Sequence, residues 1–117
     1  MTGEDVTKLD DLEDHERLAL GGLIRILIRL DGSFSEEEEA HLDEVAGSIG
    51  TPEALWRVIS RSAQEHANDD AIRAAATSVE RVGARQLIRG ALESIARAET
   101  IEPAEQELLD WLDETWA

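Results

Sequence analysis

The sequence predicts an all-α protein, folded as a compact bundle of six to seven helices. Sustained alternation of apolar and polar residues, which indicates β-strands, is nearly absent. Apolar residues recur instead at helical spacing along most of the 117-residue chain. Both prolines stand where a helix can begin. With this length and 42% hydrophobic residues, one core is expected. We therefore predict a single domain over residues 1–117, with residues 1–9 frayed.

Local signals place the helices in order. The first covers residues 10–30, where Gly21–Gly22 either divides it or lets another helix approach closely. Ser35 and Glu38 match an S-x-x-E capping box that begins a helix at 36–47. The remaining helices are expected at 52–66, after the Thr51 cap, at 68–82 and 84–98, separated by Gly83 or continuous, and from Pro103 onward. Trp56 and Trp116 are expected in the core.

The net charge of −16 is unevenly distributed. Acidic residues dominate 1–16, 31–53 and 99–117, whereas 17–30 and 54–98 are net positive. Such a chain should repel nucleic acids and anionic membranes and attract cations or a basic protein surface. We therefore predict a protein partner with a basic surface and no nucleic acid. Alternatively, the acidity only maintains solubility or reflects a salt-rich host.

The sequence lacks the residues that several classes of enzyme chemistry require. The chain has no cysteine, which excludes disulfides and thiolate chemistry. His15, His41 and His66 lie in separate predicted elements without a metal-binding spacing, and no serine stands in a nucleophile elbow. We predict that the protein is not an enzyme.

The N-terminus is acidic, unlike a signal peptide. The longest apolar stretch, 18–30, is too short to span a bilayer and contains Arg25 and Arg29. We therefore expect a cytoplasmic protein without membrane insertion. At least one of these arginines should form a structural ion pair with an acidic loop.

Two segments, about 18–48 and 86–116, resemble each other as helix–acidic loop–helix units. At an offset of 68, Leu20, Gly22, Ile24, Leu27, Arg29 and Asp31 align with Ile88, Gly90, Leu92, Ile95, Arg97 and Glu99. At an offset of 67, Phe34, Ser35, Glu38, Leu42, Asp43 and Val45 align with Ile101, Glu102, Glu105, Leu109, Asp110 and Leu112. Chance similarity of two amphipathic helices is the alternative to a true repeat.

The stretch from Leu30 to Glu38, a helix end followed by D-G-x-[aromatic or aliphatic]-S-x-x-E and a new helix, resembles the signature of TerB-like domains, the tellurite-resistance family. The second unit, Glu99 to Glu105, lacks the Asp-Gly pair. The resemblance implies a compact helical domain with a sensing or adaptor role in metal or chemical stress, phage defence or membrane-associated complexes. It does not imply catalysis.

These observations give two functional hypotheses. The first is a TerB-like binding or adaptor domain, with a response to Ca²⁺ or Mg²⁺, in a bacterial stress or defence system. The second is an acidic inhibitor or immunity-type protein that blocks a nucleic-acid-binding surface. Candidate cation ligands are Asp31, Glu38, Glu99 and Glu105, although helix capping alone would explain Asp31 and Glu38. Candidate partner-binding residues are Glu36, Glu39, Asp43 and Trp111, which is either an exposed anchor or part of the core edge.

Overall fold

The computed structural model describes residues 6–30, 36–97 and 101–117; of Glu38 it describes only the backbone. These residues form six α-helices and a short 3₁₀ helix, so the predicted all-α fold is confirmed. The elements are η1 (Leu9–Asp11), α1 (Asp14–Leu30), α2 (Glu36–Ile49), α3 (Pro52–Glu65), α4 (Asp69–Thr77), α5 (Val82–Ala96) and α6 (Pro103–Thr115).

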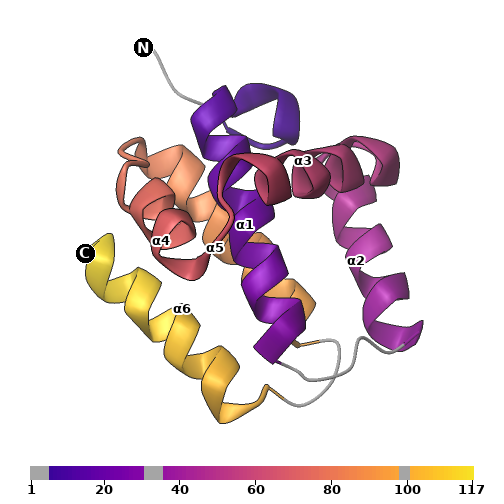
Figure 1. The fold of residues 1–117 in the computed structure, drawn as a ribbon. Coiled ribbons are helices and arrows are strands. Elements are labelled where there is room, and N and C mark those ends of the chain that lie inside the picture. Colours follow the sequence, from indigo (N-terminus) through magenta and orange to yellow (C-terminus); the bar gives the residue numbers. More distant parts are fainter. Residues whose placement is uncertain (1–5, 31–35, 98–100) are drawn as a thin grey trace.

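Helix α1 is the centre of the bundle, and α3, α4, α5 and α6 all pack against it (Figure 1). Its middle is apolar on every side, as a helix surrounded by others requires. Nearly every residue from Leu18 to Leu27 is buried; Arg25 alone is partly exposed. Helix α2 stands at the edge of the bundle and packs mainly on α3 and α5.

Gly21 and Gly22 do not divide α1. A Cβ atom on Gly21 would lie 2.9 Å from the carbonyl oxygen of Val58, and one on Gly22 would lie 2.9 Å from side-chain atoms of Ile72. The two glycines therefore allow α3 and α4 to approach the backbone of α1, which is the second of the two predicted roles.

The connection between α4 and α5 differs from the prediction. Helix α4 ends at Thr77 and α5 begins at Val82, so Gly83 lies inside the first turn of α5 and does not separate the helices. The Ser78 N–H lies within reach of the carbonyls of Ala74, Ala75 and Ala76, which tightens the last turn of α4. Val79 then enters the core.

Two further expectations about burial were wrong. Leu9 is 3% exposed and belongs to the core, so the fraying expected for residues 1–9 does not extend to it. Trp56 is 37% exposed because α3 turns Leu55, Val58, Ile59 and Ser62 inward, and position 56 falls outside that face. Trp116 is partly buried and packs against the core, and its Nε1 donates to the carbonyl of Ala76 at 2.9 Å.

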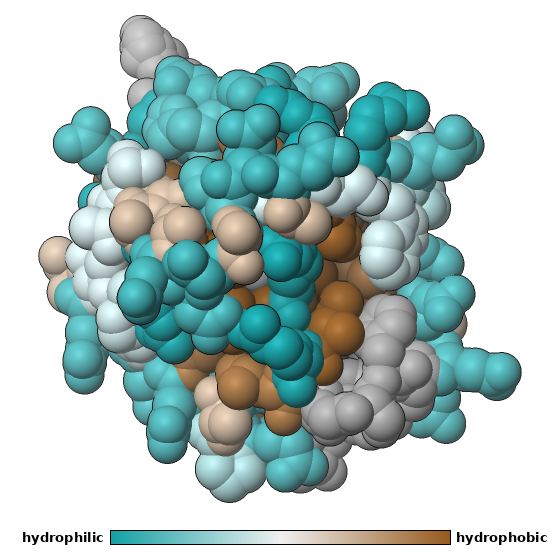
Figure 2. Space-filling model, viewed as in Figure 1, coloured by the Kyte–Doolittle hydropathy of each residue, from teal (hydrophilic) through white to brown (hydrophobic). Residues whose placement is uncertain are grey.

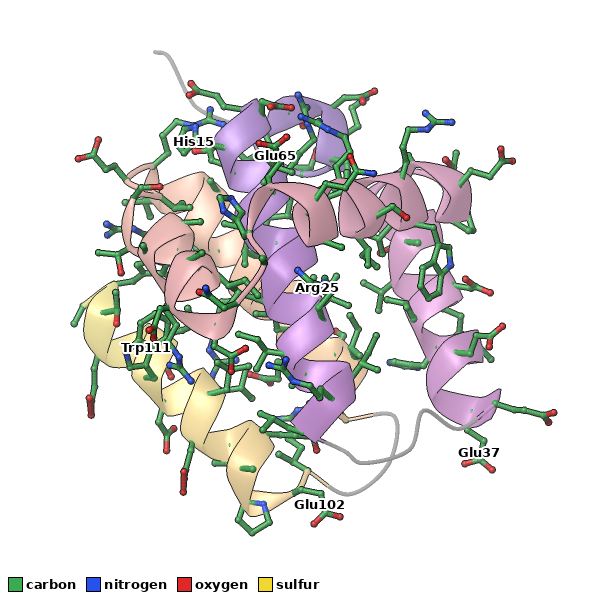
Figure 3. The ribbon with its side chains drawn as sticks, viewed as in Figure 1. His15, Arg25, Glu37, Glu65, Glu102 and Trp111 are labelled. Carbon is green, nitrogen blue, oxygen red and sulfur yellow. The ribbon has the colours of Figure 1, made fainter. Side chains whose placement is uncertain are left out.

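Arg29 forms the predicted structural ion pair, although its partner Asp69 begins α4 and does not belong to an aligned acidic loop, and Arg25 binds backbone carbonyls. Arg25, midway along α1 in Figure 3, donates to the carbonyls of Ser62 at 3.2 Å and His66 at 3.0 Å, at the end of α3. Arg29 forms an ion pair with Asp69 at the start of α4. The two arginines therefore fix the connection from α3 to α4 on α1.

The two aligned units agree at their apolar positions. Leu20 and Ile88, Ile24 and Leu92, and Leu42 and Leu109 are all buried, a pattern that any two amphipathic helices could also share. Their glycines differ, because a Cβ atom on Gly90 would meet nothing within 4 Å, whereas Gly22 is tightly packed. The N-terminal ends of α2 and α6 lie at the same end of the molecule (Figure 1).

Hydrophilic side chains cover most of the face seen in Figure 2, and hydrophobic ones are visible between them near its centre. Within the described residues, no helix combines the length and apolar content needed to cross a lipid bilayer.

Candidate functional site

Helix α2 carries the most one-sided charge of the described helices. Its sequence, EEEEAHLDEVAGSI, contains six acidic residues and no lysine or arginine. Glu36, Glu37, Glu39 and Glu44 are exposed, and Asp43 is half-buried. The acids of the first turn also interact favourably with the N-terminal end of the helix dipole. Glu37 points away from the bundle at this end of α2 (Figure 3).

Several acids outside α2 form ion pairs with arginines, whereas others, such as Glu80, Glu107 and Glu114, have no partner among the described residues. Arg61 binds Asp14 through two hydrogen bonds of 2.7 and 2.9 Å, and the pKa of this carboxyl is lowered by that contact. Arg89 binds Asp113 and Glu93 in a similar way. These arginines bind acids of α1, α5 and α6, and no arginine forms an ion pair with an acid of α2 among the described residues.

The α2 acids have few contacts among the described residues. Glu44 Oε2 lies 3.4 Å from His41 Nδ1, and Asp43 Oδ1 accepts a hydrogen bond from Trp56 Nε1 at 3.4 Å. Glu36, Glu37 and Glu39 have no hydrogen-bond or ion-pair partner among the described residues. Their carboxylates are thus available to an external cation.

A groove of about 280 Å³ lies between α2 and α5. Its apolar lining is Val45, Ile49 and Leu87. The groove is open because four of its lining residues have small side chains or none: Ser48, Gly90, Ala91 and Ser94. A Cβ atom on Gly90 would meet no atom within 4 Å, so the groove is open at this position.

Two other hollows, each of about 270 Å³, are lined by arginines, most of which already bind within the protein. One lies between α5 and α6, where Arg85 donates to the Val79 carbonyl and Arg89 binds Asp113. The other lies beside α3, where Arg17 donates to the Leu12 carbonyl and Arg61 binds Asp14. The groove beside α2 therefore differs in being lined by apolar, small and amide side chains and by no arginine.

The predicted cation ligands are only partly described. Asp31, Glu99 and the side chain of Glu38 lie outside the described residues. Glu105 is 3% exposed, and its carboxylate accepts a hydrogen bond of 2.9 Å from the Glu102 N–H as part of a capping box. No group of three or more His, Asp or Glu side chains that could hold a metal ion occurs in the described part.

The predicted partner-binding residues lie at two separate places in the fold. Glu36, Glu39 and Asp43 lie on α2. Trp111 instead lies between α6 and α4 (Figure 3), where it packs against the core and the guanidinium of Arg73 lies 4.6 Å from its ring centroid. Trp111 is therefore part of the core edge.

Sequence reasoning missed Trp56 and the groove residues of α5. Trp56 stands next to Leu55 but outside the inward-facing spacing of α3, which is the signal that could have identified it as exposed. No comparable signal marks Gly90 as open. It aligns with Gly22, where the side chain of Ile72 packs against the glycine, so the alignment suggests a closed position.

No known protein family, curated protein or solved structure matches this chain. The functional argument therefore rests on the charge and shape of α2 and its surroundings.

Proposed function

We propose that this chain is a non-enzymatic binding domain, an adaptor that holds a partner protein through a basic surface of that partner. The observation that supports it is the set of exposed carboxylates on α2, of which Glu36, Glu37 and Glu39 have no partner among the described residues. Lysines or arginines of a partner would gain these carboxylates as ion-pair partners, and the negative field would speed their approach.

The resemblance of the Leu30–Glu38 stretch to TerB-like domains supports a cytoplasmic role in a bacterial stress or defence system. A Ca²⁺ or Mg²⁺ response is part of the same proposal. It rests on the Asp31 and Glu38 carboxylates in the sequence, since oxygen ligands suit these hard cations.

The proposal can be tested by capture of partners from the native host with two variants of equal charge. One replaces Glu36, Glu37 and Glu39 by glutamine. The control replaces the exposed residues Glu80, Glu107 and Glu114 by glutamine. A protein that wild type and control capture at low salt, and that the α2 variant does not, would support the proposal. Equal capture by both variants would contradict it.

The uncompensated charge of α2 also suits the second hypothesis, an inhibitor that covers a nucleic-acid-binding surface. The two functions differ in what happens to the captured protein. If the purified partner loses nucleic-acid binding when the domain is added in equal amount, the inhibitor hypothesis is favoured over the adaptor.

A further inference from the structure

A row of polar residues on α2 borders the groove. Glu37, His41, Glu44 and Ser48 follow one another at spacings of four, three and four residues, so they lie along one side of the helix. Ser48 itself lines the groove and Glu44 lies one turn before it, so the row forms a rim at this end of the groove and continues along α2 to Glu37. Just after α5, the exposed residue Arg97 is held by Glu93 at 2.9 Å. The α2 rim is therefore acidic, and these two charges at the end of α5 are paired with each other.

We infer that the groove between α2 and α5 binds an amphipathic, basic helix of a partner protein. One or two large apolar side chains of that helix enter beside Gly90, between Ile49 and Leu87, and its lysines or arginines meet Glu37 and Glu44. This inference rests on the proposed function and adds the site and the kind of partner to it.

The size and lining of the groove favour side chains over a free ligand. Its volume of about 280 Å³ lies at or below the lower end of pockets that enclose small molecules. An amphipathic helix places its apolar residues at positions i, i+3 and i+4 in such a groove, while its polar residues reach the rim. A 14-residue helix such as α2 is about 21 Å long, so three to four turns of a partner helix can lie beside it.

The charge excludes a second copy of this chain as the favoured occupant. Each chain carries a net charge of −16, and pairing through this groove would bring two acidic α2 helices together. Like charges in such contact oppose association. Charge complementarity therefore points to a basic partner.

The direct probe is a synthetic 16-residue helical peptide of leucine and lysine, with the leucines on one face. A second peptide has the same composition but distributes the leucines around the helix. Binding of both to the full chain is measured by fluorescence anisotropy at low and high salt. We expect the amphipathic peptide to bind at least about tenfold more tightly than its rearranged form, a difference of about 1.4 kcal/mol.

Matched variants locate the binding site. Gly90→Leu fills the groove and should weaken amphipathic peptide binding at least tenfold, whereas Gly47→Leu on α2 lies outside the groove lining and should change it less than twofold. Glu37→Gln with Glu44→Gln should weaken binding about tenfold at low salt. Glu36→Gln with Glu39→Gln removes the same charge away from the rim and should weaken it less.

Circular dichroism checks that each variant folds. If Gly90→Leu does not fold, Ser94→Lys places a positive charge at an exposed position of the groove and should weaken binding by repulsion.

The outcomes separate this inference from the proposed function. If neither peptide binds at low salt while capture of the host partner still depends on Glu36, Glu37 and Glu39, only the further inference is wrong; the capture experiment alone decides the proposed function. If both peptides bind equally, or if Gly90→Leu and Ser94→Lys bind like wild type, the acidic surface binds without the groove, and only the further inference is wrong. A wild-type dimer that Gly90→Leu dissociates would also overturn the inference, because a second copy would then occupy the groove.

Discussion

Arg81 binds the carboxylate of Glu16 at two points, although the two residues are 65 positions apart. Arg81 Nε lies 3.0 Å from Glu16 Oε2, and Nη2 lies 2.5 Å from Oε1. The Glu16 residue is 1% exposed, and its Oε1 also accepts a hydrogen bond of 2.6 Å from the Glu13 N–H. This ion pair, in which the glutamate is buried and the arginine is partly exposed, joins the first turn of α1 to the residue before α5.

Replacing only Arg81 should strongly lower the free energy of unfolding. Arg81→Met leaves the Glu16 carboxylate buried without its guanidinium, and we expect a loss of about 3–5 kcal/mol in the free energy of unfolding. Replacing both residues by methionine should cost clearly less, because no unpaired charge remains buried. Urea denaturation measures both values. Arg57→Met, at an exposed residue without an ion pair in the described structure, serves as control and should change stability by less than about 0.5 kcal/mol. Equal losses for the single and double variants would contradict the argument.

The ion pair of Glu16 and Arg81 should also make the free energy of unfolding depend on pH. Burial raises the pKa of Glu16, but the hydrogen bonds from Arg81 and the Glu13 N–H outweigh it, and the pKa is lowered overall. The unfolded glutamate titrates near pH 4.3, so the stabilising contribution is complete above about that value. It is lost as the pH falls through the lower, folded pKa. We therefore expect the free energy of unfolding of wild type to fall more steeply between about pH 5 and 3 than that of Glu16→Gln. Urea denaturation across this pH range measures the free energy of unfolding of both proteins. Parallel plots of that free energy against pH would show that Glu16 does not contribute to the pH dependence.

Helix starts could be predicted because their signals are local. The Thr51 hydroxyl accepts from the Ala54 N–H at 3.1 Å, and the Asn68 side chain accepts from the Ala71 N–H at 2.9 Å. The end of α4 could not be predicted in this way. The alanine-rich helix carries no local stop, and it ends where Val79 enters the core and Arg81 reaches Glu16.

The candidate site was predictable only in part for a similar reason. The run of glutamates from Glu36 is evident in the sequence, but which acids remain unpaired depends on where the arginines lie in the fold. Arg61, for example, neutralises Asp14 across 47 positions. The groove depends on the open space beside Gly90, and the aligned Gly22 occupies a position where Ile72 fills that space.

Two pairs of helical glycines, Gly21 and Gly22 on the one hand and Gly47 and Gly90 on the other, should respond to alanine in opposite ways. A Cβ atom on Gly21 or Gly22 would approach Val58 or Ile72 to 2.9 Å, so Gly21→Ala and Gly22→Ala should destabilise the fold by about 1–3 kcal/mol. Gly47→Ala and Gly90→Ala meet open space and should stabilise it by up to about 1 kcal/mol, because alanine favours the helix. Thermal and urea denaturation measure these changes. A stabilising Gly22→Ala would show that α1 and α4 do not pack as described.

Glu105 tests whether the second acidic loop binds a cation or only begins a helix. Its carboxylate is engaged with the Glu102 N–H, so Glu105→Ala should lower the stability by about 0.5–2 kcal/mol through loss of the capping box. If this is its role, the decrease in melting temperature is the same in millimolar Ca²⁺, in millimolar Mg²⁺ and in EDTA. Glu107→Ala, at an exposed position of the same helix, is the control and should change little.

A ligand role would give a different result. A cation bound only by the folded protein raises the melting temperature with its concentration, and this rise would disappear in Glu105→Ala. A rise that persists in Glu105→Ala but disappears in Asp31→Asn would assign the cation to the first loop, whose Asp-Gly pair the second loop lacks. We expect no part of a cation response to depend on Glu105, because a carboxylate that accepts the Glu102 N–H from a buried position would have to leave the cap to bind metal.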